Sequence, residues 1–144
     1  MRNVFLLLAI LSSLVSCARV DYESAARESE PLRLLLLRYY EANGHFPGSL
    51  DSLKALDPAF DGEGDLWKRW YYTANYSSSY DKAYAVWTYP GPTRQSLWFK
   101  FNPERPSETG WFIDNENGSA RKVTAIPLLP QERDLLRRKS GTEK

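Results

Sequence analysis

Residues 31–44 read PLRLLLLRYYEANG, and this stretch decides the fold. Four of its apolar side chains share one face at helical spacing: Leu32, Leu35, Leu36 and Tyr39. Asn43-Gly44 is a strong helix stop, because glycine readily adopts the left-handed conformation that follows a helix. The stretch therefore predicts an amphipathic helix whose leucine face must be covered by another part of the chain.

The beginning of this helix has two interpretations. Residues 18–30 are polar and acidic, and we expect them to begin as a tether and then become helical. Ser29 or Glu30 could cap a helix that has Pro31 in its first turn, where a missing N–H costs nothing. Alternatively, a longer helix starts near Asp21 and kinks at Pro31.

A short second helix is expected downstream. Phe46-Pro47-Gly48 turns the chain, and Ser49 is a plausible N-cap for a helix over residues 50–56. Asp57-Pro58 ends it, because proline disfavours helical conformation in the residue before it.

The next part of the chain is unusually aromatic. Between Phe60 and Phe112 lie 15 of the 20 Trp, Tyr and Phe residues. Aromatic runs separated by Gly, Pro, Asn and Ser are typical of strands, which we expect over 67–76, 80–89, 96–101 and 110–114. The turn signal NENG at 115–118 predicts a last short strand over 119–124 that pairs back on the fourth. The expected fold class is α+β, with an N-terminal helix packed on a small antiparallel sheet.

Alternation along the strands divides the aromatic residues between two faces. We expect five residues to face the helix: Tyr84, Val86, Leu97, Phe99 and Phe101. Trp87, Tyr89 and Trp98 then lie on the outer face. Exposed aromatic patches usually contact something, so these three residues form a possible binding surface for an envelope protein or a glycan such as peptidoglycan. The alternative is that segment 119–138 folds over them.

The N-terminus predicts export and lipid attachment. Arg2 precedes a short apolar run, which is the layout of a signal peptide and is too short to span a bilayer. Residues 14–17, LVSC, resemble the lipobox of bacterial lipoproteins. The resemblance implies that residues 1–16 are removed and that Cys17 is acylated. Cys17 is the only cysteine, so no intramolecular disulfide can form.

The same resemblance suggests a location. Ala18 follows the lipidated Cys17, and in lipoprotein sorting of enteric-type bacteria an Asp there would favour the inner membrane. We therefore expect a lipid-anchored protein of the cell envelope, held at the outer membrane and facing the periplasm. Its first partner is the membrane, through the N-terminal lipid.

Chain length and charge suggest one domain. We expect four segments: 1–16, the signal peptide; 17–28, the lipidated Cys and tether; 29–126, a single α+β domain; and 127–144, a basic C-terminal tail, partly helical or disordered. Without the signal peptide, 18 basic residues balance 18 acidic ones. This balance gives no basic field for nucleic acid. A short helix over 130–138 is expected to close the chain. The basic tail is expected to be solvated, with a membrane-surface or partner-binding role as the alternative.

The chemistry of the chain points away from catalysis. His45 is the only histidine, and it has no second His or free Cys to act with. We therefore expect no catalytic residues, no metal site and no cofactor. An envelope enzyme that uses carboxylates stays as an alternative, because the 18 Asp and Glu residues offer many pairs.

Part of the chain resembles the globular domain of type II secretion pseudopilins. The resemblance rests on residues 39–47, YYEANGHFP, followed by 49–53, SLDSL, with a looser echo at 65–72; it covers roughly residues 28–90. It implies a pilin-like fold, with a helix followed by a small antiparallel sheet. The chain lacks the prepilin start and the long stalk helix of that family, so the resemblance implies the fold rather than assembly into a pseudopilus. A structural component related to a secretion or pilus-like machinery is therefore an alternative function.

The family's calcium loop is not reproduced. Residues 114–118, DNENG, lack the alternating carboxylates of a calcium site. We expect a hairpin turn there.

Overall fold

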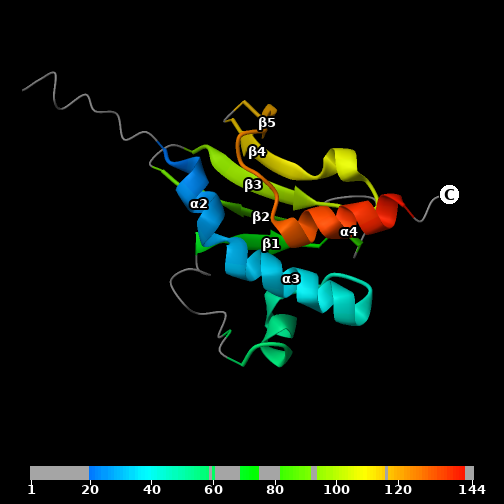
Figure 1. Cartoon of the computed structure of the whole chain (residues 1–144). Helices are drawn as coiled ribbons and strands as arrows, with labels where there is room; N and C mark the ends of the chain where they lie inside the picture. The colour runs from blue at the N-terminus through cyan, green and yellow to red at the C-terminus, as the bar shows by residue number, and fades with distance from the viewer. Residues whose placement is uncertain are drawn as a thin grey trace, which may run out of the picture.

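The structure is a computed structural model that describes residues 20–58, 60, 69–74, 82–91, 94–115 and 117–141. Within these residues, three α-helices lie against one five-stranded sheet (Figure 1). The expected signal peptide and Cys17 fall outside the described residues, as do parts of the first two expected strands. The expected α+β class is confirmed.

The N-terminal helical region is broken into two helices. Helix α2 spans Tyr22–Glu28 and helix α3 spans Glu30–Asn43, with the break at Ser29. Asp21 caps α2 by accepting a hydrogen bond from the Ser24 N–H at 2.9 Å. The Ser29 hydroxyl donates to the Ala26 carbonyl at 2.7 Å instead of capping α3. The structure is therefore closer to the alternative of a longer helix that starts near Asp21. The helix is interrupted at Ser29, two residues before Pro31.

This arrangement corrects the expected start of the domain. We expected a tether through residue 28, but Ala25 and Ala26 of α2 are buried in the core. The polar side chains of this segment lie on the exposed face of α2. They dominate its composition, and for that reason the sequence predicted a tether.

The C-terminal end of α3 is as expected. Gly44 takes the left-handed conformation at φ 76°, and its N–H bonds the Tyr40 carbonyl at 2.7 Å. Phe46 is fully buried in the core. The centre of its ring lies 4.6 Å from that of Tyr40 and 4.7 Å from that of Tyr84. The short 3₁₀ helix η1, Leu50–Ala55, follows within the range expected for a helix.

The sheet is an antiparallel meander in the order β1-β2-β3-β4-β5. Its strands are β1, Tyr71–Thr73; β2, Tyr84–Thr88; β3, Ser96–Phe101; β4, Gly110–Asp114; and β5, Ala120–Val123. The bounds of β3 and β4 match the expected ranges, and the other three lie inside theirs. The 3₁₀ helix η4, Pro106–Glu108, lies between β3 and β4.

The hairpin between β4 and β5 is confirmed. Asp114 pairs with Ala120, and Gly118 has the left-handed φ of 78° that its turn requires. The Gly118 N–H bonds the Asn115 carbonyl at 2.9 Å.

The core lies between the helices and one face of the sheet. Leu32 and Leu36 of α3 have no exposed surface. All five residues expected to face the helix are also fully buried in this cluster: Tyr84, Val86, Leu97, Phe99 and Phe101. The alternation argument is therefore confirmed for this inner face.

Helix α4, Pro130–Ser140, includes the short helix expected over 130–138. It packs beside α3, which corrects the expectation of a solvated tail. Leu135 is buried in the core, and Glu132 has no exposed surface. The Arg33 Nε donates to Glu132 Oε1 at 2.8 Å, and Arg33 Nη2 bonds Oε2 in the same bidentate pair. The C-terminal segment through residue 140 is therefore part of the folded unit rather than a solvated tail.

The same ion pair is held against the sheet. The Arg33 guanidinium lies 4.0 Å from the centre of the Phe99 ring and 5.0 Å from that of Trp111. The Leu129 N–H also donates to Glu132 Oε2, at 2.8 Å. Burial raises the pKa of the Glu132 carboxyl, and the Arg33 charge opposes that shift.

We predict that Arg33→Met lowers the free energy of unfolding by about 3–5 kcal/mol at pH 8, because it leaves a buried carboxylate without its cation. The loss should be smaller at pH 5. Without Arg33, the folded-state pKa of Glu132 lies above its unfolded value, so the folded state binds the proton more tightly. The loss of unfolding free energy therefore becomes smaller as the pH is lowered. Urea denaturation of both proteins at the two pH values measures this difference.

Two further variants make the test specific. Arg33→Met/Glu132→Leu should recover most of the stability at pH 8, because it removes both buried charges. Arg138→Met breaks an exposed pair with Glu41 and should cost about 0.5 kcal/mol or less. A double variant as unstable as Arg33→Met would show that lost packing, not lost charge pairing, causes the effect.

Candidate functional site

The outer face of the sheet carries a row of aromatic residues, one from each of four neighbouring strands. The register aligns Tyr71 with Trp87, Trp87 with Trp98, and Trp98 with Phe112, and Lys122 of β5 completes the row. These residues alternate with the buried ones, so they all lie opposite α3. We call this surface the outer face.

The rings of the outer face stack on one another. Trp87 and Trp98 are 4.3 Å apart between ring centres and nearly parallel at 9°. Tyr71 stacks on Trp87 at 5.4 Å and 18°. The Trp98 indole N–H donates to the Ser96 hydroxyl at 2.8 Å, which fixes the rotation of that ring. Trp87 therefore has both faces in contact with neighbouring rings, and both tryptophans are half-buried.

Two lysines extend the stack toward β5. The Lys100 ammonium lies 5.9 Å from the centre of the Trp98 ring and 5.0 Å from that of Phe112. The Lys122 ammonium lies 5.7 Å from the centre of the Phe112 ring and donates to the Ser107 carbonyl at 3.5 Å. Gly110 makes room for this side chain, since a Cβ there would approach the Lys122 Cε to 3.0 Å. The outer face thus combines aromatic surface with positive charge.

A small slot opens between Trp98 and Phe112. It has a volume of about 160 Å³ and is lined by Trp98, Lys100, Phe112, Asp114 and Ala120. Asp114 Oδ1 is shielded from solvent and has no hydrogen-bond partner among the described residues. We call this feature the outer slot.

The three aromatic residues selected from the sequence lie together. Trp87 and Trp98 are in the stack, and Tyr89 lies on the same side, 53% exposed, with its ring 6.1 Å from Tyr71. Alternation along 96–101 also placed Lys100 on the face of Trp98, whereas sequence reasoning missed Tyr71, Phe112 and Lys122. Alternation along 110–114 could have placed Phe112, because it flanks the buried Trp111.

The C-terminal segment does not cover the outer face. Residues 120–123 pair at the edge of the sheet as β5, and α4 packs beside α3 on the opposite side (Figure 1). The alternative that segment 119–138 folds over Trp87 and Trp98 is therefore wrong.

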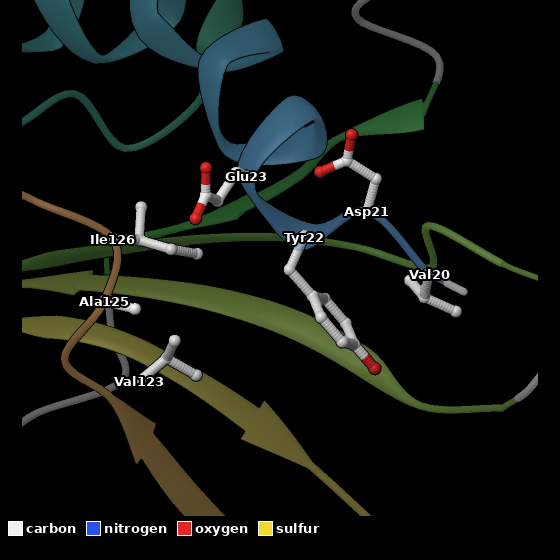
Figure 2. A pocket seen from close by; sticks show the side chains of 7 residues that line it. All are labelled: Val20, Asp21, Tyr22, Glu23, Val123, Ala125 and Ile126. Carbon is white, nitrogen blue, oxygen red and sulfur yellow. The ribbon is translucent and has the colours of Figure 1, made fainter.

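A second hollow lies at the beginning of α2. It has a volume of about 420 Å³, and its lining combines apolar and acidic residues: Val20, Asp21, Tyr22, Glu23, Val123, Ala125 and Ile126. Figure 2 shows Val123, Ala125 and Ile126 along one side and Tyr22 along the other. The Tyr22 hydroxyl donates to the Gln95 side chain at 2.9 Å, so the ring is held in place. An adjoining hollow of about 240 Å³ shares Glu23, Ala125 and Ile126.

The residues considered for catalysis are in structural contacts. His45 Nδ1 faces the Phe46 carbonyl at 3.0 Å, and its ring meets the edge of Tyr39. Over the described ranges, no group of three or more His, Cys, Asp or Glu side chains could hold a metal ion. Within the same ranges, no helix is long and apolar enough to cross a membrane.

No protein-family model matches the chain, and comparisons with curated proteins and with solved structures find no match. The outer face must therefore be interpreted from its own geometry.

We predict that Trp98→Ala lowers the free energy of unfolding by about 1–3 kcal/mol, since it removes a half-buried ring that stacks on Trp87. Tyr89→Ser should change it by about 0.5 kcal/mol or less, because that side chain is mostly exposed. Urea denaturation compares the two variants. Equal effects would contradict the stacked arrangement.

Proposed function

We propose that the protein is a lipid-anchored lipoprotein of the cell envelope with a non-catalytic binding role. The lipobox at residues 14–17 supports the anchor, and the absence of a second cysteine leaves Cys17 as the acylation site. The outer membrane, facing the periplasm, is the proposed location, because Ala18 rather than Asp follows Cys17.

The observation that carries the binding role is the outer face. Tyr71 and Tyr89 are 50% and 53% exposed and adjoin the stacked tryptophans. Large aromatic side chains dominate binding surfaces because they bury much area at low entropic cost. An envelope protein or a glycan is the proposed partner, and no nucleic acid is expected.

A structural component of a secretion or pilus-like machinery is the second candidate. Its support is the order of elements after α3: Gly44, the buried Phe46, η1 and then the antiparallel sheet, as in the pseudopilin domains that the sequence resembles. Co-purification with secretion components would favour this candidate.

The carboxylate-dependent enzyme has less support. Among the described residues, Glu132 is the Asp or Glu whose side chain is fully buried. Both of its carboxylate oxygens accept hydrogen bonds from Arg33, and the Leu129 N–H is a further donor. A carboxylate engaged in this way serves packing rather than proton transfer.

We predict that Cys17→Ser abolishes incorporation of a palmitate analogue and releases the protein from the membrane fraction. The reason is that acyl chains need the thiol, and each buried methylene adds about 0.8 kcal/mol to membrane binding. Metabolic labelling with fractionation measures both effects. A variant that is still cut before residue 17 and stays membrane-bound would contradict the lipoprotein proposal.

The binding role predicts site-specific contact. A photo-crosslinking amino acid in place of Tyr89 should give a discrete adduct in the native envelope. The same replacement at Leu56, an exposed apolar residue at the end of η1, should not. Equal adduct patterns at the two positions, or none, would count against the outer face as a binding surface.

A further inference from the structure

We propose that one end of the domain contacts the phospholipid headgroup layer, and that the Tyr89 side chain holds it there. This inference rests on the proposed lipid anchor and adds the orientation of the domain on the membrane. It is carried by three observations: where the chain enters the domain, which connections lie there, and where the exposed tyrosines are.

The chain enters the folded unit at the end of the sheet that carries the β2–β3 and β4–β5 connections. Val20 packs closely on Gly91, since a Cβ on Gly91 would lie 2.7 Å from Val20 Cγ2. The Tyr22 hydroxyl donates to the Gln95 side chain at 2.9 Å, and the Gln95 amide donates to Asn115 at 3.2 Å. The start of α2 is therefore tied to both connections. We call their described residues the turn end: 89–91, 94, 95, 115 and 117–119.

The position of Cys17 brings the turn end to the bilayer. Cys17 precedes Val20 by three positions, which span at most about 11 Å. Acyl chains on Cys17 would hold that residue at the limit of the hydrocarbon, and the headgroup layer beyond it is roughly 5–8 Å thick. Even a fully extended connection would leave Val20 within about 6 Å of the headgroups.

The side chains at this end suit the headgroup layer. Three large apolar side chains are exposed among the described residues: Leu56, Tyr71 and Tyr89. Tyr89 belongs to the turn end because it follows the last residue of β2, and Tyr71 lies beside it as the first residue of β1. A tyrosine ring has an apolar body and a polar hydroxyl, and tyrosines are enriched at membrane–water interfaces for that reason. Tyr89 is therefore the side chain that fits this layer.

This orientation leaves the proposed partner surface open. The strands then stand upright on the membrane, so that Trp98 and Phe112 of the outer face point sideways. Tyr89 stands where the outer face meets the turn end, and its ring can contact a partner beside the domain as well as headgroups below it. The C-terminal ends of α3 and α4, joined by the pair of Arg138 with Glu41, lie at the opposite end of the molecule (Figure 1).

The test places a fluorophore on the full lipidated protein in vesicles of phosphatidylethanolamine and phosphatidylglycerol. Cys17 is the only cysteine and acylation occupies its thiol, so an introduced cysteine is the sole free thiol for labelling. Labels on Arg94→Cys and Ser140→Cys compare the turn end with the opposite end, and both positions are exposed. We expect quenching by lipids with a nitroxide on the headgroup to be about threefold stronger, or more, at position 94.

A second comparison separates contact from tethering alone. Tyr89→Ser should lower the quenching at position 94 by about twofold or more, because the ring no longer holds the turn end in the headgroup layer. Leu56→Ser is the matched control. It removes an exposed apolar side chain at the end of η1, which packs on α3, and should leave the quenching unchanged. Unfolding curves of both variants check that each protein is folded in the assay.

Two results would overturn the inference. Equal quenching at positions 94 and 140 would show that the domain has no fixed orientation. Quenching at position 94 that Tyr89→Ser leaves unchanged would show that the connection to the lipid alone keeps this end near the bilayer. Mass spectrometry of the same samples measures acylation of Cys17. Either result with acylated protein contradicts the headgroup contact and leaves the anchor standing, whereas an unmodified Cys17 contradicts the anchor and the inference together.

Discussion

The buried ion pair between Arg33 and Glu132 is the contact on which the arrangement of the helices depends. It joins α3 to α4 across 99 positions of sequence, with one side chain 2% exposed and the other fully buried. The guanidinium also rests on Phe99 and Trp111 of the sheet. Neither helix can leave this face without exposing apolar surface and leaving a charge without its partner. Helices α3 and α4 are therefore held on the same side of the sheet.

This one-sided packing explains why the two faces of the sheet use aromatic residues differently. On the inner face, Phe99 and Trp111 belong to the same core cluster as the leucines of α3 and have no exposed surface. On the outer face, Trp87 and Trp98 cover mainly each other. Mutual stacking removes part of their apolar area from water without a second layer of structure. The outer rings thus contribute to stability and still present a surface to a partner.

Local signals predicted the local structure well. The turn residues around β4 and the alternation within β3 depend only on neighbouring residues, and both were placed correctly. The pair of Arg33 with Glu132 was not predictable, because charges in helical segments are usually solvated and nothing near either residue marks its partner. For the same reason, the packing of α4 and α2 against the core was missed although helical structure was expected in both segments. Their buried residues are few, and their exposed faces dominate the composition.

The outer face was predicted in part. Trp87, Tyr89 and Trp98 followed from alternation along two strands. Lys100 followed in the same way, but Tyr71 and Lys122 required the register between strands, which a single sequence does not give. The outer slot depends on that register, since its residues come from three different strands.

The early start of α2 has a consequence for the proposed lipid anchor. If Cys17 carries the lipid, only four residues separate it from Tyr22, the first residue of α2. The helix cap Asp21 is one of these four. Four residues span at most about 14 Å when fully extended. The folded unit would then sample a thin layer next to the bilayer surface, with the hollow beside Tyr22 close to the headgroups. Any partner of the outer face would then be held within the same short distance of the bilayer.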